Sequence, residues 1–166
     1  MNTDIERKIA VIFATDVVGY SKHIETDENA TIKNLRACES LLKGLFEKYK
    51  ARLFNTGGDS FFGEFESAVA AVECAVEFQN AIKRRNKTAD ATVKLEFRIG
   101  INVGDVIKEK GNLLGDGVNI AARLESLAQA SGISISKGIF EYVSSKTKLS
   151  FADQGIQKVK SNQFHV

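Results

Sequence analysis

Apolar residues along the chain recur with two different periods, which predicts a protein built from both strands and helices. Residues 9–18 are apolar at nearly every position, as in a central strand that is buried on both faces. Over residues 29–50 the apolar positions recur at helical spacing, which predicts one long amphipathic helix. The helical spacing returns over residues 67–85 and predicts a second helix.

Glycines divide two further strand patterns. Residues 51–65 predict a strand, a Gly-Gly turn and a second strand, and Asp59 comes directly after that turn. Residues 93–107 alternate at first and then contain Gly100 and Gly104, which predicts a strand, a tight bend or bulge, and a further strand.

The last third of the chain adds shorter elements. Residues 108–114 are predicted as a loop, and Asp116 is the expected cap of a helix that opens at Gly115. A short strand, a helix and a closing hairpin are predicted over 132–136, 137–145 and 155–160. Hairpins mixed with helical crossovers favour an α+β fold over a doubly wound parallel sheet, with a mostly antiparallel, ferredoxin-like or palm-type sheet and flanking helices.

Length and charge set the class of protein. With 166 residues, of which 43% are hydrophobic and 27% charged, we expect a single compact domain over 1–166 with its core in about 9–166. The formal net charge of +2 is too small for a nucleic-acid surface. The densest cationic stretch, Lys83 to Arg85, ends a predicted helix, where positive charge complements the helix dipole.

Cysteine spacing and the lack of long apolar runs indicate a compartment. Cys38 and Cys74 lie in helical patterns without the spacing of a metal or redox motif, so we expect reduced core residues. No apolar run approaches the ~20 residues of a membrane span, and the N-terminus has no signal-peptide pattern. We therefore expect a cytoplasmic chain without a membrane segment.

Two aspartates stand where a carboxylate needs an explanation. Asp16 lies within the apolar run 9–18, where a charge is costly unless a cation or a lysine compensates it. If the strands carrying Asp16 and Asp59 are neighbours, both carboxylates meet at one sheet edge. Such oxygen ligands suit Mg²⁺ or Mn²⁺, and two ions can clamp the attacking and leaving oxygens of a nucleotidyl transfer. The alternatives are that Asp16 marks a strand end and that Asp59 is a solvated hairpin residue.

A polar pair lies on the helix that opens at Gly115. Asn119 and Arg123 are four residues apart and therefore share one helix face. An amide can orient a sugar, and a guanidinium can hold phosphate charge. The alternative is a surface asparagine beside an arginine in an ion pair.

Four motifs in sequence order resemble the catalytic domain of class III nucleotidyl cyclases, the adenylate and guanylate cyclases. The resemblance extends from about Ile9 to the last residues and implies the class III cyclase fold. The motifs are residues 14–21 (Ala-Thr-Asp-Val-Val-Gly-Tyr-Ser), 56–61 (Thr-Gly-Gly-Asp-Ser-Phe), 97–104 (Phe-Arg-Ile-Gly-Ile-Asn-Val-Gly) and 115–124 (Gly-Asp-Gly-Val-Asn-Ile-Ala-Ala-Arg-Leu).

The resemblance implies a two-metal site. Asp16 and Asp59 match the two metal-binding aspartates, and the main chain of Val17 matches the carbonyl that helps to hold one ion. Two Mg²⁺ or Mn²⁺ ions per site are therefore implied. Nucleotide contacts are expected at Gly19 and Gly58, where a ligand can approach the main chain closely.

The resemblance also implies the reaction and the assembly. Asn119 matches the residue that orients the ribose, Arg123 the one that steadies the α-phosphate, and Lys160 the one that grips the triphosphate, with Lys158 as the other register. In this family the metals and the Asn/Arg pair come from different protomers, which implies a head-to-tail homodimer with two equivalent clefts. The implied reaction turns a nucleoside triphosphate, ATP or GTP, into a 3′,5′-cyclic nucleotide and pyrophosphate.

The sequence departs from the family at the base-reading positions. Asn55 and Asn112 stand where adenine-specific members carry a lysine and an aspartate. Because an amide both donates and accepts hydrogen bonds, two asparagines imply no clear base preference. Asp105 stands where some members carry an arginine, which removes a contact to the triphosphate.

Two other functions compete with a nucleotidyl cyclase. The stretch 57–61 (Gly-Gly-Asp-Ser-Phe) resembles the signature of diguanylate cyclases, but that function leaves Asn119 and Arg123 without a role. A catalytically impaired cyclase-homology module that binds nucleotide or dimerises, and so regulates a partner, is supported by the two asparagines. The retained Asp16 and Asp59 oppose it.

Overall fold

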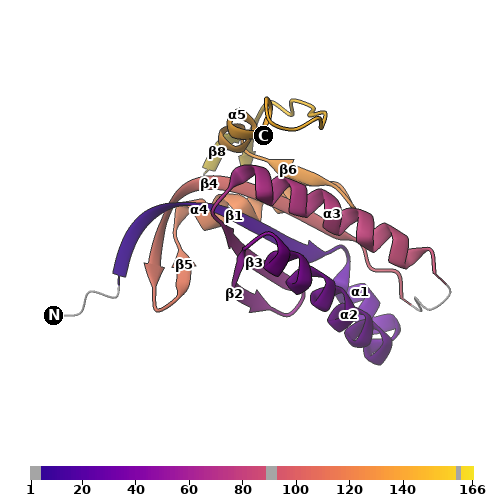
Figure 1. Ribbon diagram of the computed structural model, residues 1–166. Helices are drawn as coiled ribbons and strands as arrows, with labels where there is room; N and C mark the ends of the chain where they lie inside the picture. The colour runs from indigo at the N-terminus through magenta and orange to yellow at the C-terminus, as the bar shows by residue number, and fades with distance from the viewer. Residues whose placement is uncertain (1–4, 89–92, 160–161) are drawn as a thin grey trace.

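A twisted, mostly antiparallel sheet forms the centre of the molecule (Figure 1). The computed structural model describes residues 5–88, 93–159 and 162–166, with 156–159 and 162–165 described by their backbone alone. The strand order is β2-β3-β1-β4-β5, and β6 pairs in parallel with β4. The strands are β1 (Ile5–Val17), β2 (Arg52–Gly57), β3 (Ser60–Phe65), β4 (Phe97–Glu109), β5 (Asn112–Leu114) and β6 (Ile133–Ile135).

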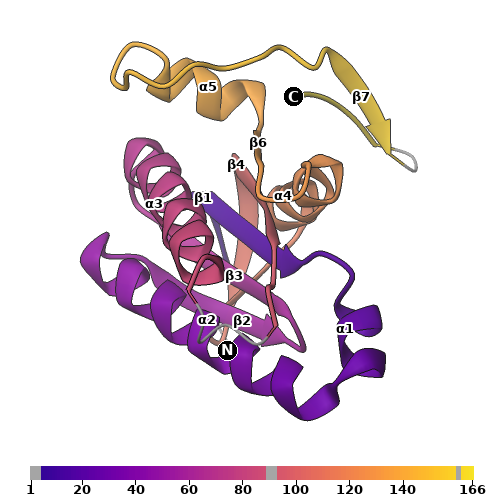
Figure 2. The same cartoon turned by 90° about the vertical axis from the view of Figure 1, so that its right-hand side faces the viewer.

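Helices cover both faces of this sheet, which confirms the expected α+β class. Figure 2 shows α3 and α4 on opposite sides of β1 and β4, with α2 on the side of α3. A separate two-stranded hairpin, β7-β8, follows α5. The remaining elements are α1 (Tyr20–Thr26), α2 (Glu28–Lys48), α3 (Ala68–Asn86), α4 (Asp116–Leu127), α5 (Lys137–Val143), β7 (Ile156–Val159) and β8 (Asn162–His165).

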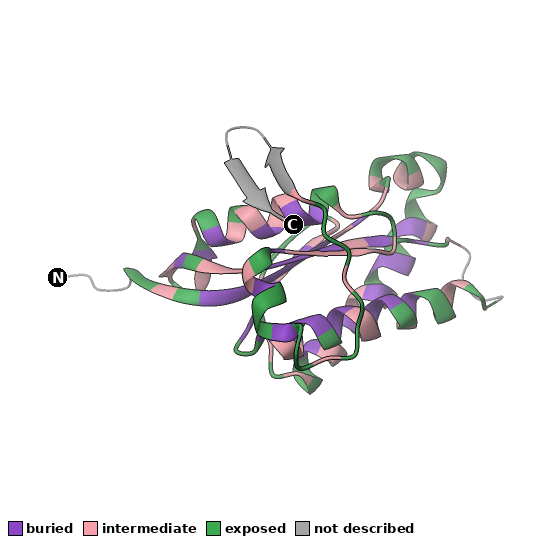
Figure 3. Cartoon of the chain, turned by 90° about the horizontal axis from the view of Figure 1, so that it is seen from above, coloured by how far each residue is buried: buried purple, intermediate pink, exposed green. Residues whose placement is uncertain are grey.

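The alternation of side chains along β1 divides the core into two layers. Val11 and Phe13 belong to the larger cluster, which α2 and α3 complete. Ala10, Ile12 and Ala14 point to the other face and pack against Ala121 of α4. The predicted central strand is therefore correct, because nearly every residue of its second half is buried between helices (Figure 3).

The expected bend at Gly100 and Gly104 is wrong, because β4 runs unbroken from Phe97 to Glu109. Gly100 is needed for close packing instead. A Cβ built at this position would lie within 3 Å of the Glu125 backbone nitrogen and of the Ala121 carbonyl oxygen, both in α4. The missing side chain therefore lets α4 rest directly on β4, which positions the C-terminal half of that helix.

Three local expectations are also corrected. The predicted loop 108–114 contains β5, which pairs with the end of β4. Gly115, not Asp116, is the N-cap of α4, with a φ of 103° that favours glycine, and no side chain caps this helix. The short helix α1 was not predicted, and it separates β1 from α2, whose N-cap is Asp27. None of the helices in the described part of the chain has the length and apolar character needed to cross a bilayer.

Candidate active site

The structure brings Asp16 and Asp59 to the same end of the sheet. Asp16 is the penultimate residue of β1, and Asp59 occupies the turn between β2 and β3, next to Gly58 with its φ of 60°. Because β3 pairs antiparallel with β1, with Phe61 opposite Thr15, the turn reaches the end of β1. Asp59 Oδ2 accepts a hydrogen bond from the Val17 main-chain N–H at 3.0 Å, which fixes this carboxylate beside the strand end.

Arg98 of β4 is the direct cross-strand partner of Asp16. Its Nη2 donates to Asp16 Oδ2 at 3.0 Å, and its Nε donates to Oδ1 at 3.3 Å, which forms a two-pronged ion pair. This pair raises the pKa of Arg98. The cation that compensates the charge of Asp16 is therefore Arg98. This residue lies in the motif 97–104, but the sequence alone indicated no role for it.

Glu125 adds a third carboxyl group from the last turn of α4. Its Oε1 lies 3.8 Å from Arg98 Nη2, and its side chain is only 7% exposed. Burial, followed by the neighbouring Asp16 carboxylate, raises the pKa of Glu125 to about 9. Sequence reasoning missed this residue as well, because only the packing of α4 on Gly100 places it next to the end of β1.

The donor set at this sheet edge fits a hard divalent cation. Burial raises the pKa of Asp59, and the neighbouring Asp16 adds to the effect, while the hydrogen bond from Val17 opposes it. Asp16 and Asp59 therefore lie close enough for their charges to interact. Within the described residues, no three His, Cys, Asp or Glu side chains form a metal-holding cluster. Two carboxylates completed by main-chain, phosphate and water oxygens are the donors that Mg²⁺ or Mn²⁺ prefers.

Asn119 and Arg123 lie on α4 as expected, one turn apart. Asn119 is exposed, whereas Arg123 is half-buried. The Arg123 Nε is buried and makes no hydrogen bond within the described part of the chain. No hydrogen bond or ion pair joins either side chain to Asp16 or Asp59 there, so α4 presents a donor pair that still needs a ligand.

The two base-reading asparagines differ in their surroundings. Asn55 is exposed on β2, at an irregularity in the pairing with β3. Asn112, the first residue of β5, is half-buried, and its Oδ1 accepts a hydrogen bond from the Leu113 main-chain N–H at 2.9 Å. The backbone thus takes one of the two lone pairs of the Asn112 oxygen, which leaves this side chain with more donor than acceptor capacity for a ligand.

Asp105 lies far from the carboxylate pair of its own chain. It pairs with Ile9, seven residues before Asp16 on β1, which corresponds to about 23 Å along a strand. Its Oδ2 forms an ion pair with Arg7 Nη1 at 2.7 Å. An arginine missing at this position therefore takes nothing away from the Asp16 end of the sheet.

Other predicted contact positions are only partly described. Gly19 follows β1 with a left-handed φ of 62° and is the N-cap of α1, so its backbone turns directly beside Asp16. Lys160 lies outside the described residues, as does the side chain of Lys158.

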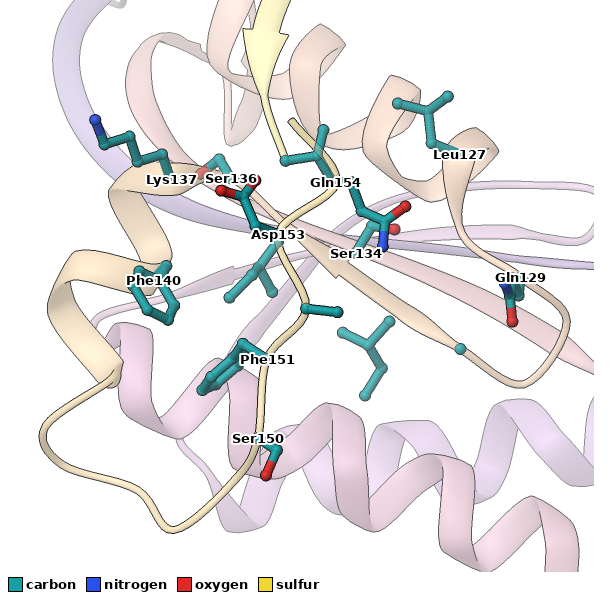
Figure 4. Close-up of a pocket in the computed structure, with 15 residues that line it drawn as sticks. Leu127, Gln129, Ser134, Ser136, Lys137, Phe140, Ser150, Phe151, Asp153 and Gln154 are labelled. Carbon is teal, nitrogen blue, oxygen red and sulfur yellow. The ribbon is translucent and has the colours of Figure 1, made fainter. Parts of the chain in front are cut away.

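A cavity of about 630 Å³ lies elsewhere, between β6, the start of α5 and the segment 150–154 (Figure 4). Apolar groups such as Phe140 and Phe151 form one wall, and Ser134, Lys137 and Gln129 add polar groups. None of Asp16, Asp59, Asn119 and Arg123 lines it. The residues with candidate chemistry are therefore open at the end of the sheet and on α4, not enclosed in this cavity.

Comparison with known families decides between the alternatives. Residues 2–165 match the sequence model described as the adenylate and guanylate cyclase catalytic domain. The chain belongs to this family. The match includes α4 with Asn119 and Arg123, which sets aside the resemblance to diguanylate cyclases at residues 57–61.

Curated relatives of this cyclase-domain chain are much longer than it is. Over 158 residues it is 42% identical to "Putative adenylate cyclase 3" of Rhizobium meliloti, a match that covers 95% of the chain and 27% of the relative. It is 29% identical to "Adenylate cyclase" of Streptomyces coelicolor, covering 82% of the chain and 34% of that protein. The chain thus spans roughly a quarter to a third of these relatives.

Solved structures confirm the cyclase fold. The adenylate/guanylate cyclase/hydrolase from Silicibacter pomeroyi is 31% identical, with a TM-score of 0.88 over 97% of this chain and 94% of that one. The adenylyl cyclase CyaB from P. aeruginosa is 24% identical, with a TM-score of 0.84 over 97% and 93% of the two chains. The second likeness shows the shared fold alone.

Proposed function

We propose that this chain is a nucleotidyl cyclase domain that converts a nucleoside triphosphate to a 3′,5′-cyclic nucleotide and pyrophosphate. The observation that carries the proposal is the hydrogen bond from Val17 N–H to Asp59 Oδ2, which holds Asp59 at the strand end beside Asp16. Family membership gives the reaction class, and the pair of carboxylates gives the place where it occurs.

Asp16, Asp59 and the Val17 carbonyl would hold two Mg²⁺ or Mn²⁺ ions. When bound, the ions supply charge stabilisation for the triphosphate and for the oxygens that gain charge during the transfer. The chain itself contributes the fixed position of Asp59 beside the end of β1.

The hydrogen-bond donors on α4, Asn119 and Arg123, bind the ribose and the α-phosphate of the substrate. Arg123 donates hydrogen bonds from its guanidinium to the α-phosphate, and Asn119 orients the ribose. The ribose 3′-oxygen forms a bond to the α-phosphorus, the bond from that phosphorus to the β-phosphate bridge oxygen breaks, and the 3′-hydroxyl proton leaves to solvent. The products are the cyclic nucleotide and pyrophosphate. Lys160 binds the triphosphate before the reaction, and pyrophosphate then departs.

Each site is shared between two copies of the chain. Asp16 and Asp59 of one protomer face Asn119 and Arg123 of its partner in a head-to-tail homodimer. Support comes from the lack of a hydrogen bond or ion pair between these two pairs within the described part of one chain, and from the unpartnered Arg123 Nε. The whole chain, 1–166, acts as one catalytic domain of this dimer.

Base choice follows from the two asparagines. Because Leu113 N–H already takes one lone pair of the Asn112 oxygen, this side chain keeps more donor than acceptor capacity, which favours a carbonyl, as on guanine, over the amino group of adenine. Asn55 is exposed and can donate or accept. GTP is therefore accepted at least as well as ATP. Both nucleotides are cytoplasmic, and the free, buried Cys38 and Cys74 are compatible with that reducing compartment.

The experiment is a product assay on the purified chain. ATP or GTP is supplied with Mn²⁺, and cyclic nucleotide and pyrophosphate are quantified. The two products should form in equal amounts. Asp59→Asn, which keeps the shape of the side chain but removes the charge, should lower turnover by at least about 100-fold without changing the folded state. Nucleotide binding without product would overturn the proposal in favour of a regulatory module, and equal turnover by the variant would overturn the assignment of Asp59 as a metal ligand.

A further inference from the structure

Arg98 and a divalent cation compete for the same carboxylate. In this structure both prongs of the guanidinium are directed at Asp16, with distances of 3.0 and 3.3 Å. A cation that binds at the proposed site needs an oxygen of Asp16, so Arg98 must give up at least part of this pair. A guanidinium that loses its acceptor in a half-buried position is strongly unfavourable unless another acceptor replaces it.

Glu125 is the acceptor within reach. Its Oε1 lies 3.8 Å from Arg98 Nη2, so a movement of about 1 Å would bring the two atoms to hydrogen-bond distance. This Oε1 is buried and has no hydrogen-bond partner within the described residues. The other oxygen, Oε2, accepts only a long bond of 3.4 Å from the Ser126 hydroxyl.

The main chain of α4 keeps Arg98 in place while its partner changes. Arg98 Nη1 donates to the Ser126 carbonyl at 3.3 Å, which ties the guanidinium to the end of α4 independently of Asp16. The close approach at Gly100 fixes that end of the helix against β4. Arg98 can therefore turn between two carboxyl groups without leaving the site.

We infer that Glu125 is a positioning residue of the metal site, which accepts Arg98 when a divalent cation takes Asp16. The inference rests on the proposed function for the identity of the metal ligands, and it adds a residue that touches neither the metal nor the nucleotide. Glu125 acts by relieving the competition from Arg98, so its role is visible in metal affinity itself.

The test measures Mn²⁺ binding to the folded chain without nucleotide, from the electron paramagnetic resonance signal of free Mn²⁺. Glu125→Leu removes the acceptor at similar volume and should weaken Mn²⁺ binding about tenfold. Glu125→Gln keeps an acceptor oxygen and should therefore retain most of the wild-type affinity for Mn²⁺. Glu141→Leu, the same change at an exposed glutamate of α5, should leave the affinity unchanged.

Repeating the Glu125 substitution in a variant that lacks Arg98 separates the proposed role of Glu125 from a general effect of charge or folding. With Arg98→Gln the competitor is absent, so adding Glu125→Leu should no longer change the Mn²⁺ dissociation constant. If Glu125→Leu alone does not fold, Glu125→Met takes its place in both backgrounds. A loss that is equally large with and without Arg98, or a Gln variant as weak as the Leu variant, would overturn the inference.

The outcomes keep the two proposals apart. Wild-type binding that disappears in Asp59→Asn while Glu125→Leu binds normally would contradict only the role of Glu125. Equal binding by wild type and Asp59→Asn would contradict the metal site itself. Binding that is lost in Asp59→Asn, weakened in Glu125→Leu and independent of Glu125 without Arg98 supports both.

Discussion

Single side chains at this site depend on the groups beside them as much as on their own chemistry. Asn112 is an example, since the Leu113 N–H takes one of the two lone pairs of its side-chain oxygen and leaves both amide hydrogens as donors. The sequence shows an amide that can donate and accept, and only the local backbone shifts the balance between the two. Base recognition is therefore best tested at this residue.

Restoring the residues of adenine-specific family members should shift base choice. Asn112→Asp supplies an acceptor for the adenine amino group, and Asn55→Lys supplies a donor for a ring nitrogen. We expect the ATP to GTP ratio of kcat/KM to rise about tenfold in the double variant, which is the effect of one hydrogen bond in a specificity pocket. An unchanged ratio would contradict the assigned base-reading positions, and Asn80→Asp, at an exposed position of α3, is the control.

A second prediction concerns acid stability. Burial alone would raise the pKa of Glu64, but Lys8 Nζ at 2.8 Å and Arg52 Nη2 at 2.9 Å outweigh it and hold the pKa below its usual value. The stabilisation is therefore present above the unfolded value of 4.5 and is lost as pH falls through the folded value. Glu64→Gln should cost about 1 kcal/mol at pH 7 and much less at pH 3, measured by urea unfolding.

The matched control for Glu64 is its exposed neighbour Glu66. Glu66→Gln should change the free energy of unfolding little at either pH. If Glu64→Gln lost as much stability at pH 3 as at pH 7, the ion pairs with Lys8 and Arg52 would not be the cause.

The sequence predicts some of these residues and not others for a physical reason. Asp16 and Asp59 are conspicuous because a carboxylate interrupts an apolar strand or follows a glycine turn. Arg98 and Glu125 gain their importance from contacts over long sequence separations, 82 residues between Arg98 and Asp16. Strand register and helix packing determine such contacts, and neither can be derived from local periodicity.

Among the elements, α4 and β4 determine the geometry of the site. Gly100 and Gly117 both lie where the two elements touch, and a Cβ on Gly117 would lie 2.7 Å from the Asp105 carbonyl oxygen. Contacts this close leave no room for any other residue. The helix is thus fixed at both ends against the strand.

Gly100→Ala should destabilise the fold and the site together. The added methyl group would meet backbone atoms of α4 that cannot turn away, so the helix must shift. We expect a loss of about 1 to 3 kcal/mol in the free energy of unfolding, measured by urea denaturation, and lower turnover in the product assay.

The control for this prediction is Gly44 in the middle of α2. A Cβ there meets nothing within 4 Å, and helix propensity favours alanine, so Gly44→Ala should stabilise by about 0.5 to 1 kcal/mol. Equal stability of Gly100→Ala and wild type would contradict the close approach of α4.

Sequence periodicity predicts elements better than it predicts their breaks. The central strand, the two long helices and the hairpin carrying Asp59 are found where the pattern places them. The bend at Gly100 and Gly104 is not, because a glycine can serve either a turn or a close approach. Which of the two applies depends on a helix that begins more than ten residues later.

For the whole molecule, the proposed shared site makes activity a property of the dimer. Asp59→Asn and Arg123→Ala each damage one half of every cleft in a homodimer. In a heterodimer of the two variants both defects fall in one cleft, and the other cleft is intact. Mixing the two inactive proteins should therefore restore up to about a quarter of wild-type activity, since about half of randomly mixed dimers are mixed.

The restored activity is measured with the product assay after co-refolding or co-expression. Mixing two preparations of Asp59→Asn is the control and should restore nothing. No recovery with Asp59→Asn and Arg123→Ala, although both chains dimerise, would contradict a site built from two protomers.

The placement of α4 has a consequence for such a dimer. In the proposed dimer the same helix carries Asn119 and Arg123 toward the neighbouring chain and Glu125 toward its own sheet. A shift of α4 that accompanies ligand binding at one catalytic centre would therefore also change the geometry of the other centre. Cooperativity between the two catalytic centres would then be transmitted by α4, and it would be measured as a Hill coefficient for Mn²⁺ binding that departs from one.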